Sequence, residues 1–331
     1  MKSRIRARLT AALLGLALLG MALPGNAQAQ AQASYPSKPV TIIVPFSVGG
    51  STDLVARLVA QQLTGPLGVG VLVDNRVGGG GVVGWDAVAR AQPDGHTLLT
   101  IEMSYAIAAG LIPNLPFDPK KAFANITTAV SVPHVLVVNP GVPAKNVAEL
   151  VVLAKAQPGK LFYGSGGNGT NTHLGSELFK SLTKIEMTHV PYKGAGAVLQ
   201  DLIAGQVQVL VTSAPTALPF IKSGKLRALM VAGDERMAVL PDVPTAKEAG
   251  LPGMVMKFWI GFAAPAGTPP AVIARLNKEI IASMNTPDAK QRLAALGLDA
   301  VGNTPEQAAK LVADEMGRWA AVVKAAGIKP D

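Results

Sequence analysis

The chain has 331 residues, with 30 lysines and arginines, 21 aspartates and glutamates, four histidines and no cysteine. The lack of cysteine excludes disulfides, thiolate metal sites and a thiol nucleophile. No run of lysine or arginine occurs after the N-terminal segment, which argues against nucleic-acid binding. The histidines have no metal-ligand spacing, so we expect no metal site.

The N-terminal segment has the pattern of a secretory signal peptide. Basic residues precede the apolar stretch Leu9–Leu23, and small-x-small cleavage patterns follow, the last of them Ala31-Gln32-Ala33. The basic residues are Lys2, Arg4, Arg6 and Arg8. We predict that residues 1–33 are removed near Ala33 and that the protein is periplasmic. An uncleaved anchor is the alternative, although the apolar stretch is too short to span a bilayer comfortably.

The mature chain keeps 26 basic and 21 acidic residues, a net charge of +5, because the signal segment has four basic and no acidic residues. A mild positive balance favours an anionic ligand only weakly. The length of the mature chain is enough for two domains.

A strand, a glycine turn and a helix open the mature chain. Val40–Val44 reads as a buried strand, Gly49-Gly50 as the turn, and Ser51 or Thr52 as the expected N-cap. An apolar stripe indicates the helix that follows, and its members are Leu54, Val55, Leu58, Val59 and Leu63. The first amides of a helix lack partners and its dipole favours negative charge, so this junction is a candidate anion site. An ordinary turn with a good cap is the alternative.

The glycines at Gly79, Gly81 and Gly84 satisfy the dinucleotide pattern G-x-G-x-x-G. They follow the predicted second strand, Val69–Val73, whereas a dinucleotide site needs them after the first. Nucleotide cofactors are also scarce outside the cytoplasm. We therefore expect no cofactor, and a turn that allows tight packing of the helix 82–91.

The remaining elements repeat the alternation of strand and helix, which predicts a parallel α/β sheet. Thr97–Ile101 is a strand that runs into a loop over 102–105. A second glycine junction, Gly164–Thr170, follows the strand 160–163 and precedes a helix. Two such junctions would place two helix N-termini at one cleft. Further strands are expected at 135–138, 207–211, 226–231 and 258–262, and one ends at 189–194. Further helices are expected at 147–156, 196–204, 216–223, 270–284, 288–296 and 305–326, the last capped by Thr304.

Ordered motifs along the chain resemble the periplasmic solute-binding proteins of tripartite tricarboxylate transporters, the Bug type. The resemblance runs from about Tyr35 to Ile328. The motifs include Pro45-Phe46 with Gly49-Gly50-Ser51-Thr52-Asp53, Asn75-Arg76, Pro93-Asp94-Gly95, Pro116-Phe117-Asp118-Pro119, Gly167-Asn168-Gly169, His189-Val190-Pro191-Tyr192-Lys193-Gly194, Pro241-Asp242-Val243-Pro244-Thr245 and Pro265-Ala266-Gly267-Thr268-Pro269.

This resemblance implies an α/β, type II periplasmic-binding-protein fold with two lobes, a hinge and an interlobe ligand cleft. The expected bounds are 34–134 for lobe 1, with 234–331 returning to it, and 135–233 for lobe 2. The resemblance also implies a small carboxylate ligand, a membrane permease of a tripartite tricarboxylate transporter as partner, and lobe closure on binding. We expect a monomer.

The resemblance and the two junctions together predict the ligand contacts. They are Phe46, Val48, Gly49, Gly50, Ser51, Thr52, Asp53, Ser104, Tyr105, Ser165, Gly166, Gly167, Asn168, Gly169, Thr170, His173, Tyr192 and Ser213. Thr212 stands where an acidic residue is frequent in the family. Its lack of charge removes a partner for a ligand amine, so we predict a non-amino ligand, either a di- or tricarboxylate or an aromatic acid.

Catalytic motifs are absent from the sequence, which contains no G-x-S-x-G, no H-E-x-x-H and no Walker lysine after a glycine loop. We therefore expect a binding protein and no enzyme. An exported sensor subunit that signals to a membrane kinase is the alternative function, and an α/β enzyme built on the same loops is a third.

Overall fold

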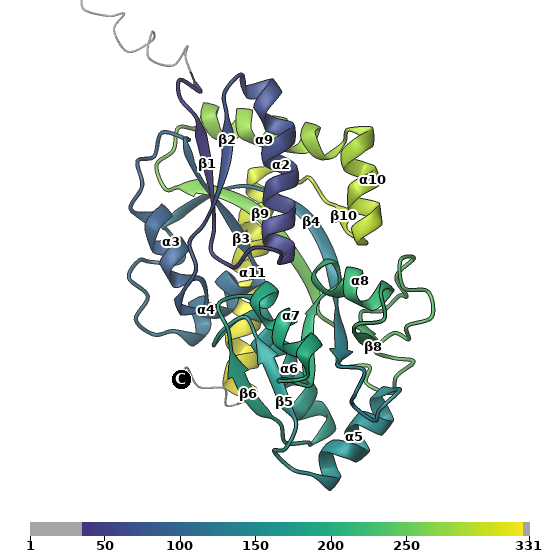
Figure 1. Ribbon diagram of the computed structural model, residues 1–331. Coiled ribbons are helices and arrows are strands. Elements are labelled where there is room, and N and C mark those ends of the chain that lie inside the picture. Colours follow the sequence, from purple (N-terminus) through teal and green to yellow (C-terminus); the bar gives the residue numbers. More distant parts are fainter. Residues whose placement is uncertain (1–34, 327–331) are drawn as a thin grey trace, which may run out of the picture. The chain divides into compact units, whose positions relative to one another are not determined.

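A computed structural model describes residues 35–326 of the chain (Figure 1). The predicted signal peptide lies outside the described residues. Of the described residues, 35–37 belong to a separate unit, in which the Tyr35–Pro36 peptide bond is cis. The unit that begins at Lys38 contains every helix and strand described below.

The helices and strands alternate along most of the chain. The strands are β1 (Val40–Val44), β2 (Val71–Asn75), β3 (Thr97–Glu102), β4 (Phe123–Val138), β5 (Phe162–Ser165), β6 (Thr188–Pro191), β7 (Val209–Ser213), β8 (Arg227–Ala232), β9 (Lys257–Pro265) and β10 (Asp299–Ala300). The helices are α2 (Ser51–Leu67), η1 (Gly79–Gly81), α3 (Val82–Ala89), α4 (Met103–Leu111), α5 (Val147–Ala156), α6 (Asn171–Thr183), α7 (Ala195–Ala204), α8 (Ala214–Lys222), α9 (Pro270–Met284), α10 (Pro287–Leu296) and α11 (Pro305–Ala326).

The strands form one continuous hydrogen-bonded sheet in the order β2-β1-β3-β9-β4-β7-β5-β6, with β8 and β10 also paired to β4. The pairs β1–β2, β1–β3, β5–β6 and β5–β7 are parallel, as the alternation of strand and helix predicts. The pairs of β4 and β9 are antiparallel. The prediction of a parallel sheet was therefore wrong at the centre, where the chain passes between the two halves.

Strand β4 divides the sheet into two lobes, because its two parts have different partners. Its residues 123–133 pair with β9, and its residues 134–138 pair with β7 and β8. We call the β1–β3 and β9 side, with α2–α4 and α9–α11, lobe 1. Lobe 2 is the β5–β8 side with α5–α8, and Figure 1 shows the two lobes on either side of the middle of β4.

A second segment crosses between the lobes beside β4. His134 N donates to Met256 O at 3.1 Å, and Met256 N donates to Ala232 O at 2.9 Å. Two neighbouring crossings, one through β4 and one between β8 and β9, give the fold its hinge. The architecture is the two-lobed α/β fold that the sequence predicted.

Two elements differ from the sequence predictions. The run 102–105 is not a loop, since α4 begins at Met103 and Glu102 caps it by accepting from Ser104 N at 2.8 Å. Strand β4 begins at Phe123, well before the predicted start at 135. The sequence did not predict this first part of the strand, because polar residues at 125, 127 and 128 interrupt the apolar pattern. By contrast, Gly84 packs as expected: a Cβ there would lie 2.8 Å from Pro45 Cα.

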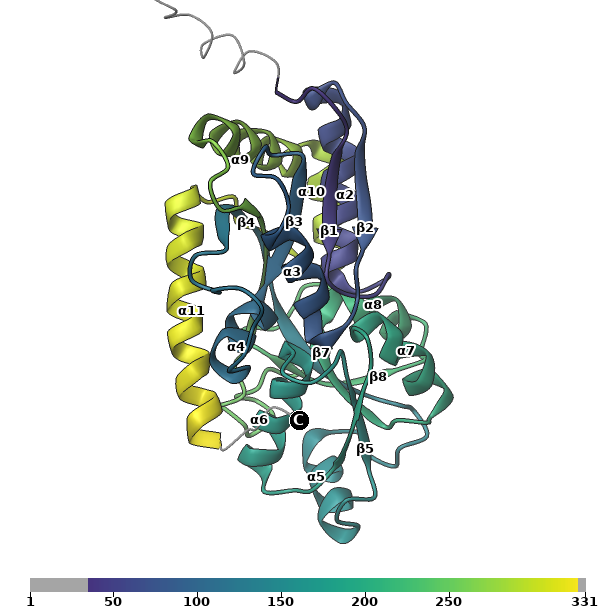
Figure 2. The same cartoon turned by 90° about the vertical axis from the view of Figure 1, so that its left-hand side faces the viewer.

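The C-terminal helix α11 packs on lobe 1. Its buried side includes Trp319, whose Nε1 donates to Glu315 Oε2 at 2.9 Å, and it runs beside α4 (Figure 2). The cap at its start is as predicted, because Gln307 N donates to Thr304 Oγ1 at 3.3 Å. Within residues 35–326 no helix combines the length and the apolar character needed to span a bilayer.

Candidate ligand-binding site

Helix α2 opens toward the junction of the lobes with no side-chain cap of its own. Its N-cap is Gly50, so the expectation of Ser51 or Thr52 as cap was wrong. Asp53 instead accepts from Gly49 N at 3.0 Å and from Asn75 Nδ2 at 2.9 Å, and pairs with Arg57. Burial opposes ionisation, but these partners hold the pKa of Asp53 below its ordinary value. An ionised Asp53 therefore braces the glycine turn.

Hydroxyl groups of lobe 2 meet the first turn of α2. Ser51 N donates to Thr216 Oγ1 at 3.1 Å. The Ser51 hydroxyl lies 2.6 Å from Ser213 Oγ and 2.8 Å from Thr216 Oγ1. The first of these contacts satisfies one amide that a helix start leaves without a partner, and all three join lobe 1 to lobe 2.

Helix α6 begins at the same junction from the other side. Thr170, the last residue of the second glycine junction, is its N-cap and accepts from His173 N at 3.4 Å. Asn171 N donates to Ser104 Oγ in lobe 1 at 3.0 Å, and Asn171 Nδ2 donates to Glu102 Oε2 at 3.1 Å. The two glycine junctions of the sequence thus place two helix N-termini at one interlobe cleft.

A cavity of about 30 Å³ lies between these helix starts. The residues that line it are Phe46, Gly50, Ser51, Thr52, Glu102, Gly166, Thr170, Asn171, Thr172, Ala195, Thr212, Ser213, Thr216 and Phe258. Two buried polar atoms of this lining, Glu102 Oε1 and Thr212 Oγ1, have no hydrogen-bond partner within the part of the chain that the structure describes. Buried polar atoms without partners are rare in native proteins, so they mark the cavity as a place for a polar ligand.

Seven of the residues predicted as ligand contacts line the cavity. They are Phe46, Gly50, Ser51, Thr52, Gly166, Thr170 and Ser213. The hydrogen bonds that hold the adjoining loops, without lining the cavity, involve Gly49, Asp53, Ser104, Ser165, Gly167, Gly169 and His173, and Asn168 lies in the same loop as Gly167 and Gly169. The ligand contacts stay a prediction.

Three further predicted contacts point elsewhere. Val48 is exposed. Tyr105 donates from its hydroxyl to Pro119 O at 2.7 Å, inside lobe 1. Tyr192 donates to Asp201 Oδ2 at 2.6 Å, and burial together with Asp201 raises the pKa of Tyr192 to about 12.

Seven lining residues were not among the predicted contacts: Glu102, Asn171, Thr172, Ala195, Thr212, Thr216 and Phe258. Glu102 had a signal in the sequence, because it directly follows an apolar strand, and ligands of α/β sheets bind at the carboxyl ends of the strands. Thr216 follows β7 as Ser51 follows β1, but only the fold brings the two hydroxyls together. Phe258 comes from the second crossing, whose place the sequence does not reveal.

Glycines let the lobes approach closely beside the cavity. A Cβ on Gly196 of lobe 2 would lie 2.5 Å from Val48 O of lobe 1, and one on Gly80 of lobe 1 would lie 2.6 Å from Asn168 O of lobe 2. Real Cβ atoms do not approach backbone oxygens this closely, so these positions require glycine for the observed contact.

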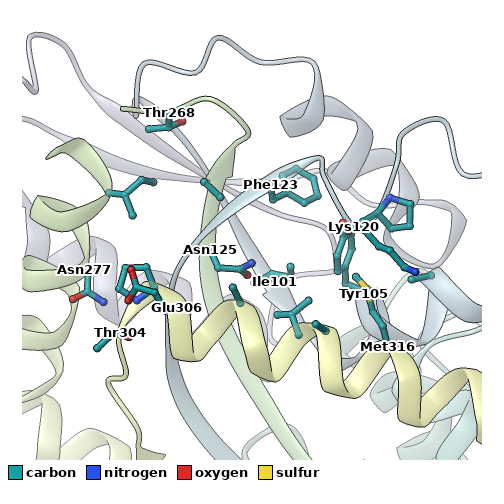
Figure 3. A pocket seen from close by; sticks show the side chains of 18 of the residues that line it. Ile101, Tyr105, Lys120, Phe123, Asn125, Thr268, Asn277, Thr304, Glu306 and Met316 are labelled. Carbon is teal, nitrogen blue, oxygen red and sulfur yellow. Dashed lines mark hydrogen bonds between the residues drawn. The ribbon is translucent and has the colours of Figure 1, made fainter. Parts of the chain in front are cut away.

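A larger cavity of about 1250 Å³ lies within lobe 1, beneath α11. Figure 3 shows α11 along this cavity, with Thr304 and Glu306 at one end and Tyr105 and Lys120 at the other. Its lining is largely apolar and comes from lobe 1 alone. Because hinge motion cannot close it around a ligand, the interlobe cavity is the better candidate for the ligand site of a two-lobed fold.

Two α/β lobes, two neighbouring crossings and a polar cavity between facing helix starts define a periplasmic binding protein. The model of the tripartite tricarboxylate transporter family receptor matches residues 55–328. The chain belongs to this family, whose members are solute-binding proteins of the Bug type.

Relatives of known sequence or structure cover about nine-tenths of this chain. Protein BugT of Bordetella pertussis is 38% identical over 298 residues, which are 89% of this chain and 91% of BugT. The R. palustris protein Rpa4515, solved with adipate, has a TM-score of 0.87 and 34% identity over 90% of this chain and 100% of its own. MatC of Rhodopseudomonas palustris, solved with bound malate, has a TM-score of 0.83 and 36% identity over 87% of this chain and 100% of its own.

Proposed function

We propose that this protein captures a small carboxylate between its lobes in the periplasm and delivers it to the membrane permease of a tripartite tricarboxylate transporter. The observation that carries the proposal is the meeting of two helix N-termini, those of α2 and α6, at a cavity with unpartnered buried polar atoms. Amides at helix starts bind carboxylates without a full counter-charge. The dicarboxylates bound to the two similar structures support the same class of ligand.

The hinge explains how a ligand is held. The cavity of about 30 Å³ is far smaller than the roughly 300–1,000 Å³ of usual small-molecule sites. A dicarboxylate therefore has to replace the direct contacts of Ser51 with Thr216 and of Asn171 with Ser104, and hold the lobes slightly further apart.

We propose the lobe bounds 34–134 with 234–331, and 135–233, and cleavage of the signal near Ala33.

A thermal-unfolding screen of the mature protein tests the ligand class. The panel contains malate, adipate, citrate, aromatic acids and acidic amino acids. A ligand at a hundred times its Kd should stabilise the fold by about 2.7 kcal/mol, which for a folded chain of roughly 290 residues is a shift of roughly 4–5 °C. We expect dicarboxylates to give this shift, and no shift with any acid would contradict the proposal.

A matched pair of variants locates the binding site. Ser51→Leu places a bulky side chain at the cavity and should abolish the shift. Ser181→Leu makes the same change on the exposed side of α6 and should keep it. Retention of the shift in Ser51→Leu would place the ligand elsewhere.

Crosslinking of the mature protein to permease-containing vesicles, with and without the active acid, tests the delivery step.

A further inference from the structure

Glu102 is a buried carboxyl group with one free oxygen at the cavity. Its side chain is 1% exposed. Oε2 accepts from Ser104 N at 2.8 Å and from Asn171 Nδ2 at 3.1 Å, whereas Oε1 has no partner among the described residues. The two hydrogen bonds fix the carboxyl group, and its free oxygen belongs to the lining of the cavity.

The lining offers no positive charge to balance an ionised Glu102. None of the described residues around the cavity is lysine, arginine or histidine. A bound carboxylate and an ionised Glu102 would therefore be two like charges in one small cavity, which raises the pKa of one of them strongly. Even without a ligand, burial raises the pKa of Glu102 to about 7, although the hydrogen bonds from Ser104 and Asn171 lower it.

The neighbouring titratable groups supply no cation either. His134 of β4 reaches Glu102 only through Asn171, whose Oδ1 lies 2.8 Å from His134 Nε2. Burial lowers the pKa of His134 to about 4, so it is neutral at physiological pH. On α4, Tyr105 bonds to Pro119 O, and on α2, Asp53 pairs with Arg57. On α6, Gly169 N donates to His173 Nδ1 at 3.1 Å. On β9, the residue paired with Glu102 is the apolar Ile260, and the residue that lines the cavity is the apolar Phe258.

We propose that Glu102 binds the ligand as a neutral carboxylic acid, with its Oε1 hydroxyl donating a hydrogen bond to an oxygen of the ligand carboxylate. A carboxylic acid kept neutral near pH 7 is a hydrogen-bond donor. The proton on Oε1 comes from solvent, so above neutral pH each anion is bound together with one proton. This inference rests on the proposed function and makes the site selective for anions that bring no ammonium group.

An amino-acid ligand would have the opposite effect. Its ammonium group would favour an ionised Glu102, and binding near pH 7 would release a proton. The sequence predicted a site without a carboxylate at Thr212, but Glu102 places a carboxyl group in the lining of the same cavity. The direction of proton exchange therefore separates the two classes of ligand.

Calorimetric titration of the mature protein with malate and with adipate, in two buffers of different ionisation enthalpy, measures this exchange. We expect uptake of close to one proton at pH 8. The apparent Kd should rise about tenfold between pH 6 and pH 8, because only the protonated form binds. Proton release, or a Kd and proton count that do not vary with pH, would overturn the proposal while leaving carboxylate binding intact.

Glu102→Gln is the matched variant, since its amide is neutral at all pH values and has both a donor and an acceptor. It should bind the acid without proton uptake, and about tenfold more tightly than the wild type at pH 8. His173 and His189 are unchanged in this variant, so any pH dependence that persists belongs to other groups. Loss of binding at every pH in Glu102→Gln, with binding kept in the wild type, would overturn the neutral-acid role. Failure of both proteins to bind any acid would overturn the proposed function itself.

Unfolding without ligand gives a second readout. The pKa of Glu102 is raised from 4.5 to about 7 in the folded protein. Its contribution to stability is therefore complete below pH 4.5 and is lost as the pH rises through 7. Between pH 4.5 and about pH 7, the unfolding temperature of the wild type should fall relative to that of Glu102→Gln. Above this range, the difference between the two unfolding temperatures should stay constant. A constant difference from pH 4 to pH 8 would show that folding leaves the pKa of Glu102 at its ordinary value, so that the group is ionised near pH 7, and would overturn the proposal.

Discussion

Gly196 has a role that depends on a single missing carbon atom. It lies in the first turn of α7, where alanine is favoured over glycine in an isolated helix. A Cβ at this position would lie 2.5 Å from Val48 O and 3.0 Å from Gly50 N, both backbone atoms of the opposite lobe. The residue therefore favours approach of the lobes at the expense of its own helix.

Gly196→Ala should weaken carboxylate binding with little change in the free energy of unfolding. Overpacking of this kind costs about 1–3 kcal/mol, but only while the lobes touch. Gly317→Ala in α11 is the control, because a Cβ there meets nothing within 4 Å. Calorimetric titration and unfolding in urea measure the two effects. Unchanged affinity in Gly196→Ala would mean that the lobes stay further apart at this point when ligand is bound.

Two threonine residues cap the starts of helices α6 and α11 in the same way. Thr170 caps α6 beside the cavity, and Thr304 caps α11 far from it. The Thr170 hydroxyl also donates to Gly167 O at 2.7 Å and lies 3.0 Å from Thr172 Oγ1, so it shapes the binding loop as well as the helix start.

Replacing each cap by alanine should separate stability from binding. Thr170→Ala and Thr304→Ala should each lower the free energy of unfolding by about 0.5–2 kcal/mol, the usual cost of a lost cap. Only Thr170→Ala should also raise the Kd for the active acid. Equal affinities in the two variants would remove the Thr170 loop from the binding site.

Elements with strong local patterns could be predicted from the sequence, and long-range pairings could not. The apolar stripe of α2, the glycine junction before α6 and the Thr304 cap identify their elements from adjacent residues. The antiparallel pairs of β4 with β7, β8 and β9 join segments that lie far apart in the chain. Part of the site follows the same rule, because Thr216 and Phe258 reach the cavity only through the fold.

At the scale of the whole molecule, β4 links the stability of the two lobes. It pairs with strands of both, and the second crossing is hydrogen-bonded to it at His134. We therefore expect the lobes to unfold together. The three tryptophans, Trp85, Trp259 and Trp319, all lie in lobe 1, so their fluorescence reports on that lobe.

Leu210→Ala tests this coupling from lobe 2. Leu210 is fully buried in β7 and pairs with Val137 of β4, so its truncation should cost about 2–5 kcal/mol. If unfolding is cooperative, the midpoint seen by tryptophan fluorescence in lobe 1 should fall together with the midpoint seen by circular dichroism. A fluorescence midpoint that stays at the wild-type value would show that the lobes unfold independently.

The cavity beneath α11 has a practical consequence for any screen of ligands. With a largely apolar lining and about 1250 Å³ of space, it is large enough to admit a solvatochromic dye in the folded protein. Such a dye would fluoresce before unfolding begins. Acids that displace it would change its fluorescence, and this change would mimic or mask the effect of a stabilising ligand. Because Trp319 is buried on the helix that covers this cavity, its emission should also respond to an occupant there. Differential scanning calorimetry, which needs no added fluorophore, is therefore the reference readout for this protein.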